Sequence, residues 1–148
     1  DGKEWTQNVS ATFFSLAQVN DKEQYNIVNN CLSKISKCMK DITGLEAYYQ
    51  TDECVRLRKI YDATKIHCDG IIHNPSNPCF KNNVRVFSII IALNSDYEGG
   101  ELCFPNQDVK IKLEAGDAII FPPYRTHLHY TNALNGTFRY TINTWLCQ

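Results

Sequence analysis

The chain has 148 residues, the length of one ordinary domain, and its formal net charge is -1. Hydrophobic residues make up 43% and aromatic residues 11%, enough for a real core, which argues against an intrinsically disordered chain. The charge gives no broad positive field of the kind that dedicated nucleic-acid-binding proteins use. The small basic cluster of Arg56, Arg58 and Lys59 is expected to be a solvated strand face. No apolar run approaches the ~20 residues of a membrane-spanning helix, so we expect no membrane partner.

Seven cysteines are scattered along the chain without a Cys-x-x-Cys pair, which argues against a zinc knuckle or a thioredoxin-type site. Reduced, half-buried thiols are the interpretation that fits this pattern best, although the pattern leaves disulfides open. The first ten residues, DGKEWTQNVS, do not have the pattern of a signal peptide and lack an initiator methionine. Together these features favour a cytoplasmic location.

One amphipathic helix is predicted over residues 21–40. Apolar side chains recur there at spacings of three and four, which is the period of one helix face. Asp21 can cap the start of the helix, and Lys37 and Lys40 suit the negative end of its dipole. Residues 1–50 are therefore expected to form a helical support, with one stripe facing the core. The stripe consists of Tyr25, Val28, Leu32, Ile35 and Met39.

Residues 51–148 are expected to form a β-rich core within the same single domain, 1–148. The run RVFSIIIALN at residues 85–94 is β-branched and almost continuously apolar, as in a strand buried on both faces. Short strands with turn signals about every 8 to 12 residues are typical of an antiparallel sandwich or barrel. Residues 70–83 contain two Pro and four Asn and are expected to be a long functional loop. Further strands are expected within residues 55–62, 64–69, 108–121, 126–132 and 137–146.

His67 and Asp69 lie two residues apart at the end of an expected strand. Side chains at i and i+2 of a strand share a face, so the imidazole and the carboxylate could converge on a divalent metal. His127 and His129 have the same spacing on another expected strand. Two His and one carboxylate, with positions left open for other ligands, form the facial triad of non-haem Fe(II) oxygenases. The alternative for each pair is a polar loop end that contacts water and has no function.

Arg139 follows His129 by ten residues and is followed by Thr141 on the same strand face. A guanidinium flanked by a hydroxyl is a good receptor for a carboxylate. Taken alone, Arg139 would be interpreted as a surface charge on a final strand. Its spacing from His129 instead allows adjacent antiparallel strands to bring both residues into one pocket.

These motifs, in this order, resemble the prolyl 4-hydroxylase-like branch of the iron and 2-oxoglutarate-dependent dioxygenases. The resemblance covers about residues 55–146 and rests on segments 67–69, 98–102, 116–123, 129 and 139–141. It implies a mostly β fold with N-terminal helices, namely a double-stranded β-helix, the jelly-roll barrel related to cupins. Within segment 98–102 the paired glycines are expected to let the chain turn sharply between strands.

The resemblance also implies the ligands of the site. His67, Asp69 and His129 would bind Fe(II), and Arg139, helped by Thr141, would bind the 5-carboxylate of 2-oxoglutarate. O2 is the further co-substrate, succinate and CO2 are released, and ascorbate would be supportive. His129 is preferred to His127 because the family's distal basic residue follows the ligand by nine or ten positions.

Some parts of the family pattern differ in this chain. Ala92 stands where many relatives have Tyr, and Tyr61 is the candidate for the Tyr that commonly precedes the HxD motif and contacts the co-substrate. His73, in the long loop, is expected to lie on the surface or beside the substrate. Cys68 is expected to pack away from the metal by strand alternation.

The sequence therefore predicts an Fe(II)- and 2-oxoglutarate-dependent dioxygenase that hydroxylates its substrate, with peptidyl proline as one candidate. The partner would be a peptide, a protein or a small molecule, since the fold hosts many functions. The alternatives are a non-catalytic module and a cupin-type metal-binding module that uses no 2-oxoglutarate. Arg139 separates these hypotheses, because only 2-oxoglutarate chemistry requires a carboxylate receptor at that position.

Overall fold

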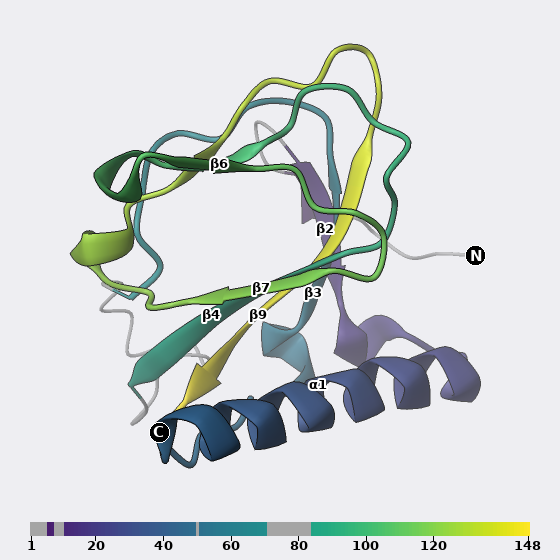
Figure 1. Cartoon of the computed structure of the whole chain (residues 1–148). Helices are drawn as coiled ribbons and strands as arrows, with labels where there is room; N and C mark the ends of the chain where they lie inside the picture. The colour runs from purple at the N-terminus through teal and green to yellow at the C-terminus, as the bar shows by residue number, and fades with distance from the viewer. Residues whose placement is uncertain (1–5, 8–10, 50, 71–83) are drawn as a thin grey trace.

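A computed structural model describes residues 6–7, 11–49, 51–70 and 84–148. It contains two β-sheets and one α-helix, α1, over Lys22–Thr43 (Figure 1). Six strands form the large sheet in the order β1-β2-β3-β9-β4-β7, and three form the small sheet in the order β6-β5-β8. The large-sheet strands are β1 Thr6–Gln7, β2 Ala11–Ser15, β3 Arg56–Ile60, β4 Arg85–Ala92, β7 Ala118–Phe121 and β9 Arg139–Cys147. The small-sheet strands are β5 Leu102–Phe104, β6 Val109–Ile111 and β8 Tyr130–Thr131.

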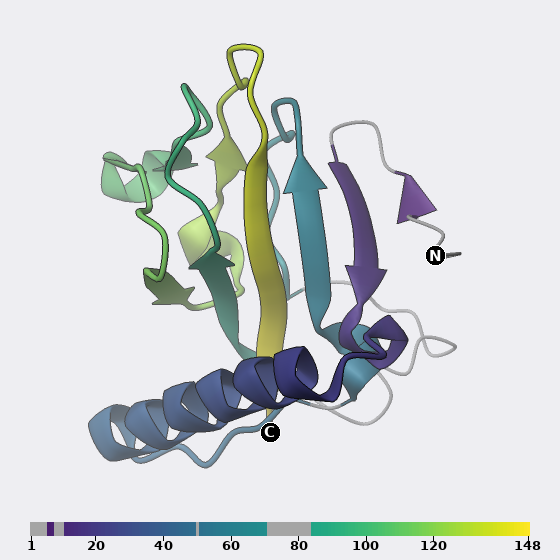
Figure 2. The same ribbon diagram turned by 90° about the vertical axis from the view of Figure 1, so that its right-hand side faces the viewer.

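The two sheets face each other and form the expected jelly-roll, and all strand pairs within them are antiparallel (Figure 1). Figure 2 shows α1 crossing the large sheet on the side away from the small sheet. The large sheet is therefore a middle layer, with the helix on one face and the barrel interior on the other. The prediction of a mostly β, double-stranded β-helix fold is confirmed.

The predicted helix forms, with one turn more than expected at its end. Asp21 caps it by accepting a hydrogen bond from the Gln24 backbone N–H at 3.0 Å, and Gly44 ends it in the left-handed conformation with a φ of 72°. Leu32 is fully buried, and the rest of the predicted stripe packs around the same core. The stripe therefore packs against the large sheet, as the 3,4 spacing predicted.

Strand β4 is buried on both faces, which the continuous apolar run predicted. Phe87, Ile89 and Ile91 belong to the core cluster beneath α1, whereas Ile90 and Ala92 belong to the cluster between the two sheets. Strand β4 thus contributes apolar side chains to both faces of the middle layer.

Residues 1–50 are not purely helical as expected, because β1 and β2 extend the large sheet. Strand β2 pairs with β3, so that Ala11 lies opposite Ile60 and Ser15 lies opposite Arg56. The partner of β2 comes from a distant part of the sequence, and such tertiary pairing is what decides strand formation in short segments.

Two expected strands are also shorter than predicted. Within 64–69 only His67 forms an isolated bridge, and residues 125–127 form a 3-10 turn ahead of the two-residue strand β8. The long loop expected at 70–83, with His73, lies outside the described residues beyond Gly70.

The cysteines are not all reduced thiols, which corrects the sequence interpretation. Cys54 is disulfide-bonded, whereas five others are free: Cys31, Cys38, Cys68, Cys103 and Cys147. Within the described part of the chain, no helix is both long enough and apolar enough to cross a membrane.

Replacing Leu32 by Ala should destabilise the fold by about 2–5 kcal/mol, because it deletes a fully buried side chain between α1 and the large sheet. Denaturant unfolding followed by circular dichroism measures the change. The matched control is Ile27→Ala on the same helix, where the side chain is 61% exposed and the expected change is below about 0.5 kcal/mol. Equal losses in the two variants would contradict the assigned helix face.

Candidate active site

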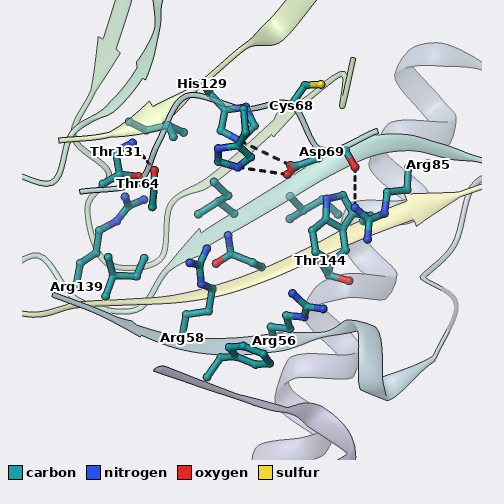
Figure 3. Close-up of a pocket in the computed structure, with 18 residues that line it drawn as sticks. Arg56, Arg58, Thr64, Cys68, Asp69, Arg85, His129, Thr131, Arg139 and Thr144 are labelled. Carbon is teal, nitrogen blue, oxygen red and sulfur yellow. Dashed lines mark hydrogen bonds and ion pairs between the residues drawn. The ribbon is translucent and has the colours of Figure 1, made fainter. Parts of the chain in front are cut away.

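Three side chains with metal-binding atoms converge at one end of the barrel. His67, Asp69 and His129 each offer one ligand atom, and these atoms lie within 4.8 Å of one another. Nε2 of His67 is 3.6 Å from one Asp69 carboxylate oxygen, and Nε2 of His129 is 3.7 Å from the other (Figure 3). Among the described residues, these three form the one group with this geometry.

The backbone positions the two histidines by a bridge rather than by long strands. The His67 N–H donates to the His129 carbonyl at 3.0 Å, and the His129 N–H donates back to the His67 carbonyl at 2.9 Å. Next to this bridge, the Thr64 N–H donates to the Thr131 carbonyl at 3.0 Å. The segment after β3 is thereby joined to β8 of the small sheet. This contact brings His67, which follows a strand of the large sheet, next to His129.

Each imidazole is fixed in the tautomer that a metal requires. Nδ1 of His67 lies 2.8 Å from the Lys65 carbonyl, and Nδ1 of His129 lies 3.0 Å from the His127 carbonyl. A carbonyl can only accept, so Nδ1 carries the proton in both rings and Nε2 keeps its lone pair. Both lone pairs lie on the ring side near Asp69, which is how metal-binding histidines are usually oriented.

Burial keeps the second histidine neutral. It is the largest influence on His129 and lowers the pKa of its imidazole, although the His127 carbonyl and Asp69 act in the opposite direction. His129 also packs against two aromatic rings, with centroid distances of 5.7 Å to Phe104 and 4.8 Å to Phe121. A neutral, rigidly held imidazole is the form that binds a divalent metal.

Asp69 is held from two sides. Its carboxylate accepts a hydrogen bond from the Ser88 hydroxyl at 2.7 Å, and its backbone carbonyl accepts one from Arg85 at 2.8 Å. Both partners come from β4, so the middle layer of the fold orients the carboxylate. Hydrogen bonds of this kind to a ligand are what usually fix its direction toward a metal.

His127 takes a different position from the one its spacing suggested. It ends the 3-10 turn Arg125–His127 instead of lying on a strand with His129, and its Nδ1 lies 3.0 Å from the Thr126 hydroxyl. Its backbone carbonyl holds the His129 ring, as described above. The structure therefore brings His129, and not His127, into the group with His67 and Asp69.

A cavity of about 450 Å³ lies beside the metal-binding group, between the two sheets. Arg139, from β9, lines it and is 1% exposed. Burial lowers the pKa of this guanidinium, and the nearby Tyr97 only partly offsets that effect. Arg139 donates to the Gly100 carbonyl at 3.1 Å, and this carbonyl is presented by the predicted glycine turn, where Gly99 and Gly100 have φ of 71° and 68°.

Arg139 has donors to spare in this cavity. Its Nε atom has no hydrogen-bond partner among the described residues, and no carboxylate of that part of the chain pairs with it. A buried cation without an anion is costly, so the site fits a ligand that brings a carboxylate. The donor set thus matches both a divalent metal and an acidic co-substrate.

Thr141 and Tyr61 are less closely connected to the cavity. Thr141 is fully buried and donates its hydroxyl to the Asn143 side chain at 2.5 Å, and Asn143 lines the cavity. Tyr61 directly follows β3 and is half-buried. Neither is among the described residues that line the cavity, so their contacts with 2-oxoglutarate stay predictions.

Sequence reasoning missed three further arginines of the cavity. Arg56 and Arg58 were expected on a solvated face, yet both line the cavity and are half-buried (Figure 3). The reason is that β3 lies inside the large sheet, between β2 and β9, so one of its faces meets the barrel interior. Arg85 also lines the cavity, where its guanidinium lies 3.5 Å from the ring centroid of Trp145. The i, i+2 spacing of Arg56 and Arg58 was the available signal, because it places both side chains on one face of the strand.

Comparison with known proteins agrees with this geometry. The chain matches the 2OG-Fe(II) oxygenase superfamily over residues 57–147. It is 35% identical to a PKHD-type hydroxylase of Prochlorococcus marinus (strain NATL2A) over 82 residues, which are 54% of this chain and 36% of that protein. A PKHD-type hydroxylase of Psychrobacter sp. (strain PRwf-1) is 35% identical over 86 residues, 55% of this chain and 32% of that protein. The chain therefore spans about a third of the length of these curated relatives.

Solved structures show the same fold. The viral collagen prolyl hydroxylase of Paramecium bursaria Chlorella virus-1 superposes with a TM-score of 0.69 at 20% identity, covering 93% of this chain and 79% of its own. A Trichoplax adhaerens prolyl hydroxylase, solved with a peptide fragment of hypoxia inducible factor, superposes with a TM-score of 0.66 at 18% identity. The match covers 92% of this chain and 62% of that one. The resemblance to prolyl 4-hydroxylase-like proteins is confirmed. Since the family match covers more than half of the chain, the protein belongs to the 2OG-Fe(II) oxygenase superfamily.

Proposed function

We propose that this chain is an Fe(II)- and 2-oxoglutarate-dependent dioxygenase that hydroxylates its substrate, with release of succinate and CO2. One observation carries the proposal. Two oriented imidazoles and a carboxylate converge beside a cavity that also contains a buried guanidinium without an anionic partner in the described chain. A metal and a dicarboxylate would complete these two halves of the site.

His67, Asp69 and His129 would hold the iron. Three protein ligands leave positions for a co-substrate and O2, which a fully enclosed structural site would not do. When bound, the iron with 2-oxoglutarate and O2 supplies the oxidising chemistry, so the protein needs no acid or base for the central step. Ascorbate, as a mild reductant, is expected to support turnover by keeping the metal ferrous.

Arg139 would anchor the 5-carboxylate of 2-oxoglutarate. Arg139 lines the same cavity as the metal-binding side chains and lies to one side of them in Figure 3, an arrangement that suits an elongated dicarboxylate. A bidentate charge-assisted contact fixes direction as well as affinity. Thr141 and Tyr61 are proposed to assist, Thr141 through its hydrogen bond to Asn143.

The apolar walls would exclude water around the reacting atoms. Phe104 and Phe121 pack on the His129 ring, and Ile90 and Leu102 line the cavity below it. A dry site strengthens each electrostatic contact and protects reactive species from side reactions.

The substrate is proposed to be a peptide, a protein or a small molecule. A peptide is supported by the structural neighbour solved with a peptide fragment, and peptidyl proline is one candidate. The cytoplasmic location expected from the sequence stays a prediction, and the disulfide-bonded Cys54 favours an oxidising compartment instead.

A cupin-type metal module that uses no 2-oxoglutarate is the second candidate, and the metal-binding group alone would serve it equally well. Arg139 favours the first candidate, because a buried cation in this position has no use without an acidic ligand. The direct test adds Fe(II), 2-oxoglutarate and ascorbate to the protein and measures succinate. Metal binding with neither 2-oxoglutarate binding nor succinate formation would favour the second candidate.

Loss of a residue that hydrogen-bonds to a metal ligand weakens metal binding roughly 10- to 100-fold. Asp69→Ala should weaken it further, because this substitution removes a ligand itself. Calorimetric titration with Mn(II) measures the affinity without turnover, and succinate formation should be lost in parallel. Asp41→Asn, an exposed carboxylate at the end of α1, is the control. Wild-type metal affinity in Asp69→Ala would remove Asp69 from the site.

Arg139→Gln should raise the 2-oxoglutarate concentration needed for half-maximal binding about 10- to 100-fold, the cost of a lost charge-assisted contact. Mn(II) affinity should change much less, since Arg139 is not a metal ligand. The measurement is 2-oxoglutarate titration of the Mn(II)-loaded protein, with the exposed Arg125→Gln as the matched control. An unchanged co-substrate requirement would show that the anchor lies elsewhere.

A further inference from the structure

The described lining residues of the cavity carry more positive charge than its proposed ligands can neutralise. Four guanidiniums line it, whereas Asp69 is the one carboxylate among its described lining residues. These side chains alone give a net charge of three positive. Iron would add two positive charges and 2-oxoglutarate would remove two, so three positive charges remain. The four guanidiniums belong to Arg56, Arg58, Arg85 and Arg139.

All four side chains keep their charge at neutral pH. Burial lowers the pKa of each, and the most affected, Arg85, falls to about 10. For Arg58 the neighbouring guanidiniums of Arg56 and Arg139 lower the pKa further, and Asp69 opposes this effect. The repulsion is therefore present in the folded protein and would be relieved by a bound anion.

Strand β3 presents two of these charges to the cavity. Arg56 and Arg58 alternate with Leu57 and Lys59, whose side chains lie on the opposite face of the strand. Leu57 packs in the core under α1, and the Lys59 ammonium lies 3.8 Å from the ring centroid of Phe138. The strand thus directs two neighbouring arginines, and no other cation of its own, toward the site.

Neither arginine has an anionic partner in the described part of the chain. The Arg56 guanidinium lies over two aromatic rings, 4.9 Å from Phe13 and 5.6 Å from Trp145. No hydrogen bond of the Arg58 side chain to another described residue is formed. Residues 71–83, which follow the HxD motif, contain no Asp or Glu. As far as the described residues go, the donors of both arginines are therefore available to a ligand.

The two arginines and Arg139 occupy different places along the cavity. In Figure 3, Arg139 lies at one end, Arg56 lies toward the other, and Arg58 lies between them, with the metal-binding group across the cavity. In the β3–β9 register, Arg139 is opposite Ile60, whereas Arg56 is opposite Asn143. One cationic end can hold the co-substrate while the other stays free for a second anion.

We propose that the substrate is itself anionic, and that a carboxylate or phosphate group on it binds Arg56 and Arg58. This inference rests on the proposed function, because it assigns Arg139 to the co-substrate. The two guanidiniums act as a clamp that orients the substrate next to the metal. An acidic peptide would be consistent with both the arginine pair and the proposed peptide substrate. A free dicarboxylic acid carries the same anionic group.

The experiment titrates the Mn(II)-loaded protein, saturated with 2-oxoglutarate in the absence of O2, and follows binding by calorimetry. The probes are capped pentapeptides with a central Pro flanked by Glu, by Gln or by phosphoserine, together with free L-glutamate. We expect the Glu or phosphoserine peptide to bind at least about 10-fold more tightly than the neutral Gln peptide. Tight binding of L-glutamate with no peptide preference would identify a small acid as the source. Equal binding of all probes would overturn the proposal.

Three variants locate the anion. Arg56→Gln and Arg58→Gln should each remove about 10-fold of the preference for the acidic probe and leave the 2-oxoglutarate requirement unchanged. Lys59→Gln, on the other face of β3, should preserve both properties. Arg139→Gln should raise the 2-oxoglutarate requirement and preserve the preference for the acidic probe.

Two results would contradict the assignment. A preference for acidic probes that survives in both Arg56→Gln and Arg58→Gln would place the anion elsewhere. A raised 2-oxoglutarate requirement in Arg58→Gln would assign Arg58 to the co-substrate. Circular dichroism verifies folding, and if Arg58→Gln does not fold, Arg56→Gln and the Glu–Gln peptide comparison still decide. Loss of the proposed function would appear separately, as wild-type protein that binds acidic probes but not 2-oxoglutarate.

Discussion

The backbone bridge between His67 and His129 is the constraint on which the candidate metal group depends. Its two hydrogen bonds join a loop that follows the large sheet to a strand of the small sheet, and Thr64 and Thr131 reinforce it. Each histidine ring then bonds to a carbonyl two residues earlier in its own segment. Rotation of either ring is thereby restricted, so the two lone pairs are oriented before any metal arrives. Asp69, which two residues of β4 hold by hydrogen bonds, completes the group.

Several guanidiniums lie on the barrel face of the large sheet, while an apolar core under α1 stabilises its other face. Such a site is more stable with its anions than without them, since each bound anion relieves repulsion in a medium of low dielectric constant. Ligands that bind only the folded chain also shift its unfolding equilibrium. The charge that we propose selects acidic ligands would therefore also couple ligand binding to the stability of the barrel.

Much of this arrangement could be predicted from the sequence. The 3,4 spacing predicted the face of α1, and the apolar run 85–94 predicted the doubly buried β4. The proximity of His67 and Asp69 was predicted from a strand that does not form, since within 64–69 His67 makes only an isolated bridge, and its partner is His129. Arg56 and Arg58 were misassigned because an alternating polar strand looks the same at an edge and inside a sheet. Only the pairing of β3 with both β2 and β9, which depends on distant residues, decides between these positions.

The β3–β9 register explains how one sheet face tolerates so much like charge. Arg58 lies opposite Thr141 and Arg139 lies opposite Ile60, so each guanidinium faces a neutral cross-strand partner. A slip of two residues would keep every side chain on its face but could place Arg58 directly opposite Arg139, which is destabilising. On the reverse face, the pairing of Leu57 with Ile142 within the core under α1 opposes that slip. The apolar contacts beneath the sheet thus hold apart the charges above it, and they keep the anchor proposed for the co-substrate separate from the clamp proposed for the substrate.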